Sequence, residues 1–94
     1  NYANLRAIRN LRERASKLEG ENRYEEALSL LYEADQIGGN RNFFVKSEIA
    51  NAISRILITL GRYTDAVKAY NKAMEYAVDQ AQLDELFISL VKPE

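Results

Sequence analysis

The chain has 94 residues, of which 47% are hydrophobic and 29% are charged, and its formal net charge is -1. These values describe one ordinary globular domain without the strong positive field that a general polyanion binder needs. Cys and His are both absent, which excludes disulfides, thiolate or imidazole metal ligands, and Cys- or His-based catalysis. We therefore expect one domain that has no cofactor and no metal site and is not an enzyme.

The sequence also bears on location. It has no run of about 18 apolar residues and no apolar core of a signal peptide near its start. We expect a soluble, cytoplasmic protein that does not enter a membrane. Because the sequence begins at Asn1 rather than Met, we also expect it to be a fragment of a longer protein.

The first two elements are predicted to be helices joined by a short turn. Apolar residues recur at intervals of three and four over 5–18, which places them on one helical face that stops near Gly20. The same spacing resumes over 24–34, before the Gly38-Gly39-Asn40 break. Together these two segments predict an antiparallel helix pair.

Three further helices are predicted in the rest of the chain. One starts around Asn42 and ends at Gly61, and the next follows at once over 63–77. The last, over about 79–91, has apolar residues at i, i+3, i+4, i+7 and i+8 and stops before Pro93. The sequence thus predicts an all-α fold of five helices.

The chain also contains an internal repeat. A shift of 39 residues aligns Arg23-Tyr24-x-Glu26-Ala27-Leu28 with Arg62-Tyr63-x-Asp65-Ala66-Val67. Beyond this motif, Leu31 falls over Tyr70 and Ala34 over Ala73. One helix pair cannot bury its apolar stripe alone, so we expect the two pairs to stack on each other.

The second copy resembles the tetratricopeptide repeat family through Leu60-Gly61-Arg62-Tyr63-x-x-Ala66-x-x-x-Tyr70-x-x-Ala73. The first copy is more divergent, and the closing Pro of the family is replaced by Gly39 and Val78. The 39-residue offset exceeds the 34-residue period of the family by five. This resemblance implies a superhelix of antiparallel helix hairpins, with repeat one at about 5–39 and repeat two at about 44–78.

The last predicted helix, 79–91, has a structural explanation. A terminal repeat leaves an apolar face that something must cover. We expect Leu83, Leu86, Phe87 and Leu90 to cover the last pair as a cap. Two alternatives stay open: this helix binds a partner through its apolar face, or it begins a further repeat.

The resemblance implies a function in protein–protein interaction. Members of the family typically bind peptides or helices of a partner in the groove lined by the first helix of each pair. Polar side chains at helical spacing mark that face here, and the alternative is that they form only a solvated surface. The predicted groove residues are Arg9, Arg12, Ser16, Glu48, Asn51, Arg55 and Thr59.

Charge asymmetry supports a second hypothesis. The first helix is basic, and the chain from Glu75 onward is acidic. Such a dipolar domain could associate with itself or dock on another segment of its parent chain. Binding of nucleic acid is less favoured, because only Tyr2 lies near the basic residues as an aromatic side chain for stacking on bases. The basic residues concerned are Arg6, Arg9, Arg12, Arg14 and Lys17.

Overall fold

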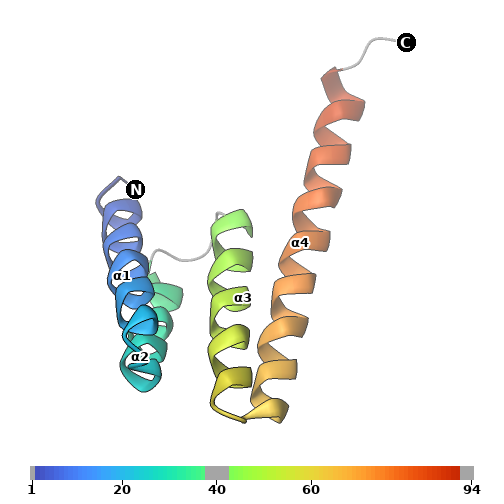
Figure 1. Cartoon of the computed structure of the whole chain (residues 1–94). Helices are drawn as coiled ribbons and strands as arrows, with labels where there is room; N and C mark the ends of the chain where they lie inside the picture. The colour runs from blue at the N-terminus through green and yellow to red at the C-terminus, as the bar shows by residue number, and fades with distance from the viewer. Residues whose placement is uncertain (1, 38–42, 92–94) are drawn as a thin grey trace.

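Helices make up all the regular secondary structure in the computed structural model, which describes residues 2–37 and 43–91 (Figure 1). The all-α prediction is confirmed for these residues. In chain order the helices are α1 (Tyr2–Gly20), α2 (Tyr24–Gln36), α3 (Phe43–Thr59) and α4 (Tyr63–Val91).

The turns after α1 and α3 have the same geometry, 39 residues apart. Asn22 has φ 62° in the first turn and Gly61 has φ 77° in the second, so both adopt the left-handed conformation that commonly ends a helix. The residue that follows Asn22 or Gly61 donates a hydrogen bond from its amide to the carbonyl oxygen five residues before it, at 2.9 Å in the first turn and 2.8 Å in the second. The sequence repeat therefore corresponds to a repeated turn.

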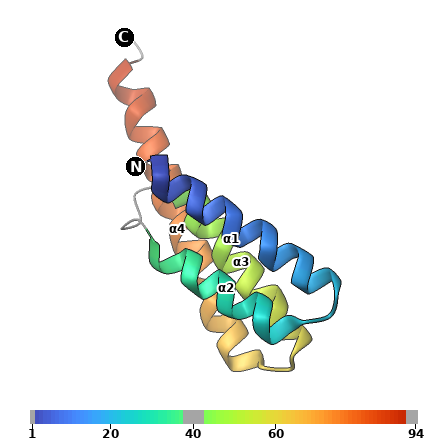
Figure 2. The same ribbon diagram turned by 90° about the vertical axis from the view of Figure 1, so that its left-hand side faces the viewer.

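Each turn joins two antiparallel helices into a hairpin, and α2 and α3 bring the two hairpins together (Figures 1 and 2). Ser54 Oγ donates to the Ala66 carbonyl oxygen at 3.1 Å, and Ser47 Oγ donates to that of Ala73 at 3.3 Å. These two bonds define the register between α3 and α4. They also show why small residues at these positions suit close contact between the helices.

The core lies between α1, α2 and α3, and α4 contributes two buried alanines, Ala66 and Ala73. Ile49 and Ile56 of α3 are fully buried. The core therefore depends on α3, which has an apolar face toward each of its neighbours. The largest cluster of buried residues consists of Leu11, Ala15, Ala27, Leu28, Leu31, Ala34, Ile49, Ile53, Ile56, Leu57 and Ala66.

A buried ion pair connects three helices at the open end of the hairpins. Lys46 of α3 is only 6% exposed. Its Nζ donates to both the carboxylate and the carbonyl oxygen of Asp35 in α2, at 2.9 and 2.7 Å. The ammonium also lies 5.8 Å from the ring centroid of Tyr76 in α4. These partners offset the cost of removing the charge from water.

The prediction of five helices is wrong: residues 79–91 continue α4, which runs unbroken for 29 residues. The physical reason is the absence of a breaker, since no Gly or Pro stands between Tyr63 and Val91. Ala and Gln around the expected break are good helix formers. Val78, at the position of the family's closing Pro, can also continue a helix.

The second half of α4 therefore extends past the rest of the molecule instead of covering the last pair (Figure 1). Continuing the α3–α4 register places Phe43, the first residue of α3, level with Ala77. Beyond that level the apolar side chains up to residue 90 are exposed, including Phe87 at 65% and Leu90 at 77%. At about 1.5 Å per residue, α4 is about 43 Å long, which explains the longest dimension of 53 Å.

Candidate functional site

The first helices of the two hairpins, α1 and α3, line a groove of about 520 Å³. Six of the seven predicted groove residues lie along it: Arg9, Arg12 and Ser16 on α1, with Glu48, Asn51 and Arg55 on α3. Thr59 is not among the lining residues. Its Oγ1 donates instead to the carbonyl oxygen of Arg55 one turn earlier, at 3.1 Å.

Helical spacing explains why these residues meet. Positions 9, 12, 16 and 19 of α1 are three or four apart, and on α3 positions 51 and 52 each lie three or four residues from both 48 and 55, so each set shares one face of its helix. The Ala15, Ala52 and Leu31 side chains lie at the bottom between the two polar rows. Because two of these three side chains are alanines, the helices leave a hollow there.

Two ion pairs cross the groove from α1 to α3. Arg12 Nη2 lies 2.8 Å from a carboxylate oxygen of Glu48. Arg55 donates two hydrogen bonds of 2.9 Å to the two carboxylate oxygens of Glu19. Both pairs are partly exposed, so each contributes at most about 1 kcal/mol to stability. They nevertheless hold the two rows of the groove at a defined separation.

The Arg55–Glu19 pair changes the acidity of both groups. Hydrogen bonds from Arg55 lower the pKa of Glu19 below its ordinary value, with a further contribution from the positive charge and a partial offset from burial. The same hydrogen bonds raise the pKa of Arg55. Glu19 therefore stays ionised at and somewhat below neutral pH, and the pair persists there.

Two groove side chains are available to a ligand. Within the described residues, the side chains of Arg9 and Asn51 have no hydrogen bond or ion pair to another side chain, and both residues are exposed. Arg9 offers a guanidinium with five donor hydrogens, whereas Asn51 offers a donor and an acceptor together. The groove as a whole is balanced in charge, because its three arginines face three glutamates, Glu13, Glu19 and Glu48.

The sequence reasoning missed five groove residues. Glu13 and Glu19 also belong to the polar row of α1. The helical spacing of Glu19 from Arg12 and Ser16, seven and three residues, already indicated that Glu19 lies on the same face. The repeat hid Glu19, because a shift of 39 residues places it over apolar Ile58. The floor residues Ala15, Leu31 and Ala52 are apolar, so a search for polar stripes could not find them.

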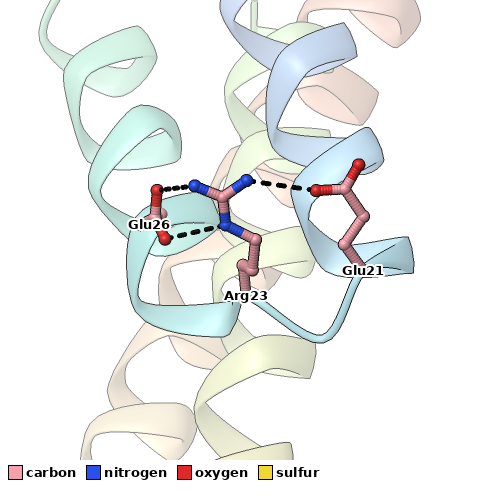
Figure 3. A network of polar contacts seen from close by, with 3 residues as sticks. All are labelled: Glu21, Arg23 and Glu26. Carbon is pink, nitrogen blue, oxygen red and sulfur yellow. Dashed lines mark hydrogen bonds and ion pairs between the residues drawn. The ribbon is translucent and has the colours of Figure 1, made fainter.

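The arginines of the two hairpin turns have different roles, although they occupy equivalent positions. Arg23 pairs within its own hairpin: its guanidinium donates two bonds to Glu26, at 2.9 and 2.6 Å, and one to Glu21, at 3.2 Å (Figure 3). These bonds raise the pKa of Arg23. Arg62 instead reaches Glu25 of α2 and so links the two hairpins.

Neither a metal centre nor a membrane span stands out in the parts of the chain that the structure describes. No cluster of three or more acidic, His or Cys residues is placed to hold a metal ion there. Likewise, none of the described helices combines the length and apolar character required to cross a bilayer.

Comparisons with known protein families, with curated proteins and with solved structures found no match to this chain.

Proposed function

We propose that the chain is a tetratricopeptide-type module that binds an extended segment of a partner protein in the α1–α3 groove. The observation that supports this proposal best is the groove itself, because its polar rows come from the first helix of each hairpin. The two equivalent turns, 39 residues apart, further support a repeat architecture.

The groove has the chemical groups that an extended peptide needs. Asn51 can pair with a peptide's main chain, which presents an N–H and a C=O at each residue. Arg9 can bind an acidic side chain through charge-assisted hydrogen bonds. Small apolar side chains of the peptide fit against the alanines of the floor. The preferred ligand is therefore a polar segment with an acidic residue opposite Arg9.

Charge balance favours a peptide over a polyanion. Of the three groove arginines, Arg12 and Arg55 already pair with glutamates of the chain. A nucleic acid would have to break these pairs, or meet the glutamates directly, to use the arginines. Binding of a segment of mixed charge requires neither, and the proposed function is binding without catalysis.

The test uses a library of random unstructured peptides, displayed and selected on the intact chain. Peptides selected by the wild type should bind at least about tenfold more weakly when Arg9 and Asn51 are both replaced by Ala, a loss of about 1.4 kcal/mol. Affinity is measured by isothermal titration calorimetry. The selected peptides should be enriched in Asp and Glu, and their affinity should fall as salt rises.

The matched control replaces Arg14 and Asn71 by Ala, which removes the same two residue types at exposed positions outside the groove. This control should bind within about twofold of the wild type, a difference of less than 0.5 kcal/mol. The proposal is wrong if selection yields no binders, or if the control loses as much affinity as the groove variant while both stay helical.

A further inference from the structure

The repeat offers a direct comparison between the two hairpins. On the first hairpin, the surface that faces the second hairpin comprises residues 15, 19, 24, 27, 28 and 31. This surface is covered. Ala15, Ala27, Leu28 and Leu31 are each at most 5% exposed, and the other two are half-buried. Leu28 and Leu31 share one core cluster with the α3 residues Ile49, Ile53 and Ile56. The α3 helix is thus the element that covers this surface.

The equivalent surface on the second hairpin is open at four of its six positions, whereas Ser54 and Ala66 are buried as Ala15 and Ala27 are. The residues 39 positions later are Ser54, Ile58, Tyr63, Ala66, Val67 and Tyr70. These six residues line a hollow of about 330 Å³. Val67 and Tyr70 are 58% and 52% exposed, whereas their counterparts Leu28 and Leu31 are buried. We call these six residues the end surface.

The end surface is uncharged, unlike its counterpart. On the first hairpin, Glu19, Glu25 and Asp35 form ion pairs with the second hairpin. The residues 39 positions later are Ile58, Thr64 and Met74. An occupant of the end surface therefore finds no carboxylates at these three places, and apolar contact must supply most of its binding energy.

The orientation of the occupant follows from α3. Lys46 near the start of α3 pairs with Asp35 near the end of α2, and Arg62 just past the end of α3 pairs with Glu25 at the start of α2. The α3 helix therefore runs antiparallel to α2. Its covering residues Ile49, Ile53 and Ile56 are spaced i, i+4, i+7, so they form one aliphatic stripe.

Head-to-tail stacking of a second copy does not fit this surface. The α1 residues that correspond to the isoleucine stripe of α3 are Asn10, Arg14 and Lys17, all exposed. If the α1 helix of another copy took the place of α3, it would bring two cations and an amide against an uncharged apolar surface. Burying such groups without partners is costly.

We propose that the end surface binds an amphipathic helix of a partner protein, antiparallel to α4, with aliphatic residues at i, i+4 and i+7 flanked by uncharged polar residues. The end surface shares no residue with the α1–α3 groove. The proposal therefore does not rest on peptide binding in the groove.

The probe is a synthetic peptide of residues 43–60 of this chain with added terminal lysines for solubility, since α3 already covers the equivalent surface. Labelled peptide is titrated with the intact chain, and binding is followed by fluorescence anisotropy.

Val67→Ser and Tyr70→Ser should each weaken binding at least about tenfold. A peptide with Ser at 49, 53 and 56 should not bind. Affinity should change less than about twofold between low and high salt, because the end surface is uncharged.

The matched control is Phe87→Ser, on the same helix and 65% exposed but outside the end surface. It should bind the peptide within about twofold of the wild type. Circular dichroism checks that each variant remains helical, and either end-surface variant suffices if the other is unstable. The proposal is overturned if the peptide does not bind, or if Phe87→Ser weakens binding as much as Val67→Ser. A wild type that sediments as a dimer, with Val67→Ser sedimenting as a monomer, would replace it with self-association.

Discussion

Asn22 and Gly61 adopt the same left-handed backbone at the two hairpin turns, with φ 62° and 77°. Gly reaches this region without steric cost, and Asn is one of the few other residues found there regularly. The Asn22 side chain also accepts a hydrogen bond from the Tyr24 hydroxyl at 2.9 Å. Local backbone requirements, rather than burial, thus explain both residues.

Gly61→Ala should destabilise the chain by about 1 kcal/mol, because a residue with a Cβ is sterically disfavoured at a positive φ. The added Cβ would meet no atom within 4 Å, so crowding adds nothing to the cost. Urea unfolding measures the change. Gly20→Ala is the control, since Gly20 has equal space but no positive φ; it should be neutral or stabilising. Equal losses in the two variants would contradict this explanation.

The α4 helix shows how the absence of a breaker shapes an element. Apolar spacing predicted a helix at each end of α4, but only the intervening residues could decide whether the chain turns between them. Nothing between Ala77 and Leu83 stops a helix. The apolar stripe that would suit a cap therefore points into solvent.

Deleting residues 81–94 should leave the free energy of unfolding within about 1 kcal/mol of the wild type, because the apolar side chains between 81 and 90 are exposed. Thermal and urea unfolding test this. A chain ending at residue 72 provides the contrast, because it also loses buried Ala73 and the Tyr76 ring beside Lys46. A large loss from the shorter deletion would mean that the end of α4 packs on the molecule.

At the scale of the whole molecule, polar contacts join the hairpins around a shared apolar core. Among the described residues, four ion pairs run between the hairpins: Arg12–Glu48, Arg55–Glu19, Lys46–Asp35 and Arg62–Glu25. Only Lys46–Asp35 is largely buried, so removing one partner there leaves an uncompensated charge. The other three are exposed enough that each is weak alone.

The Arg55–Glu19 pair predicts a dependence of stability on pH. The pKa of Glu19 is lower in the folded chain than its ordinary value of about 4.3. The stabilisation from the Arg55–Glu19 pair is therefore fully present above the pKa of Glu19 in the unfolded chain, and it is lost as pH falls through the pKa of Glu19 in the folded chain. The wild type should exceed Glu19→Gln in unfolding free energy by about 0.5 kcal/mol at pH 7, and this difference should shrink as pH falls below about 4.

Urea unfolding at several pH values measures this difference. Glu13→Gln is the matched control, because Glu13 also lines the groove but has no ion pair within the described residues. It should show no comparable change with pH. A difference between the wild type and Glu19→Gln that stays constant from pH 7 to pH 3 would contradict the role assigned to the pair.

The sequence by itself determined the helical fold class and both turns, and it predicted six of the residues that line the groove. Helical spacing and turn residues act over a few positions, so Gly61 and the Arg12–Ser16 spacing could be interpreted without knowledge of distant contacts. The groove residues required more than local spacing: the 39-residue repeat related the two helix faces, and the resemblance to the tetratricopeptide repeat family predicted that these faces line a groove.

Only the tertiary structure decided which surfaces are covered and which charges pair. Lys46 is buried, although lysines are usually exposed, because Asp35 and Tyr76 come from other helices. Val67 is exposed although its repeat equivalent Leu28 is buried, because α3 lies over Leu28 and no described residue covers Val67. Such outcomes depend on the placement of whole helices relative to each other, which spacing within one helix does not contain.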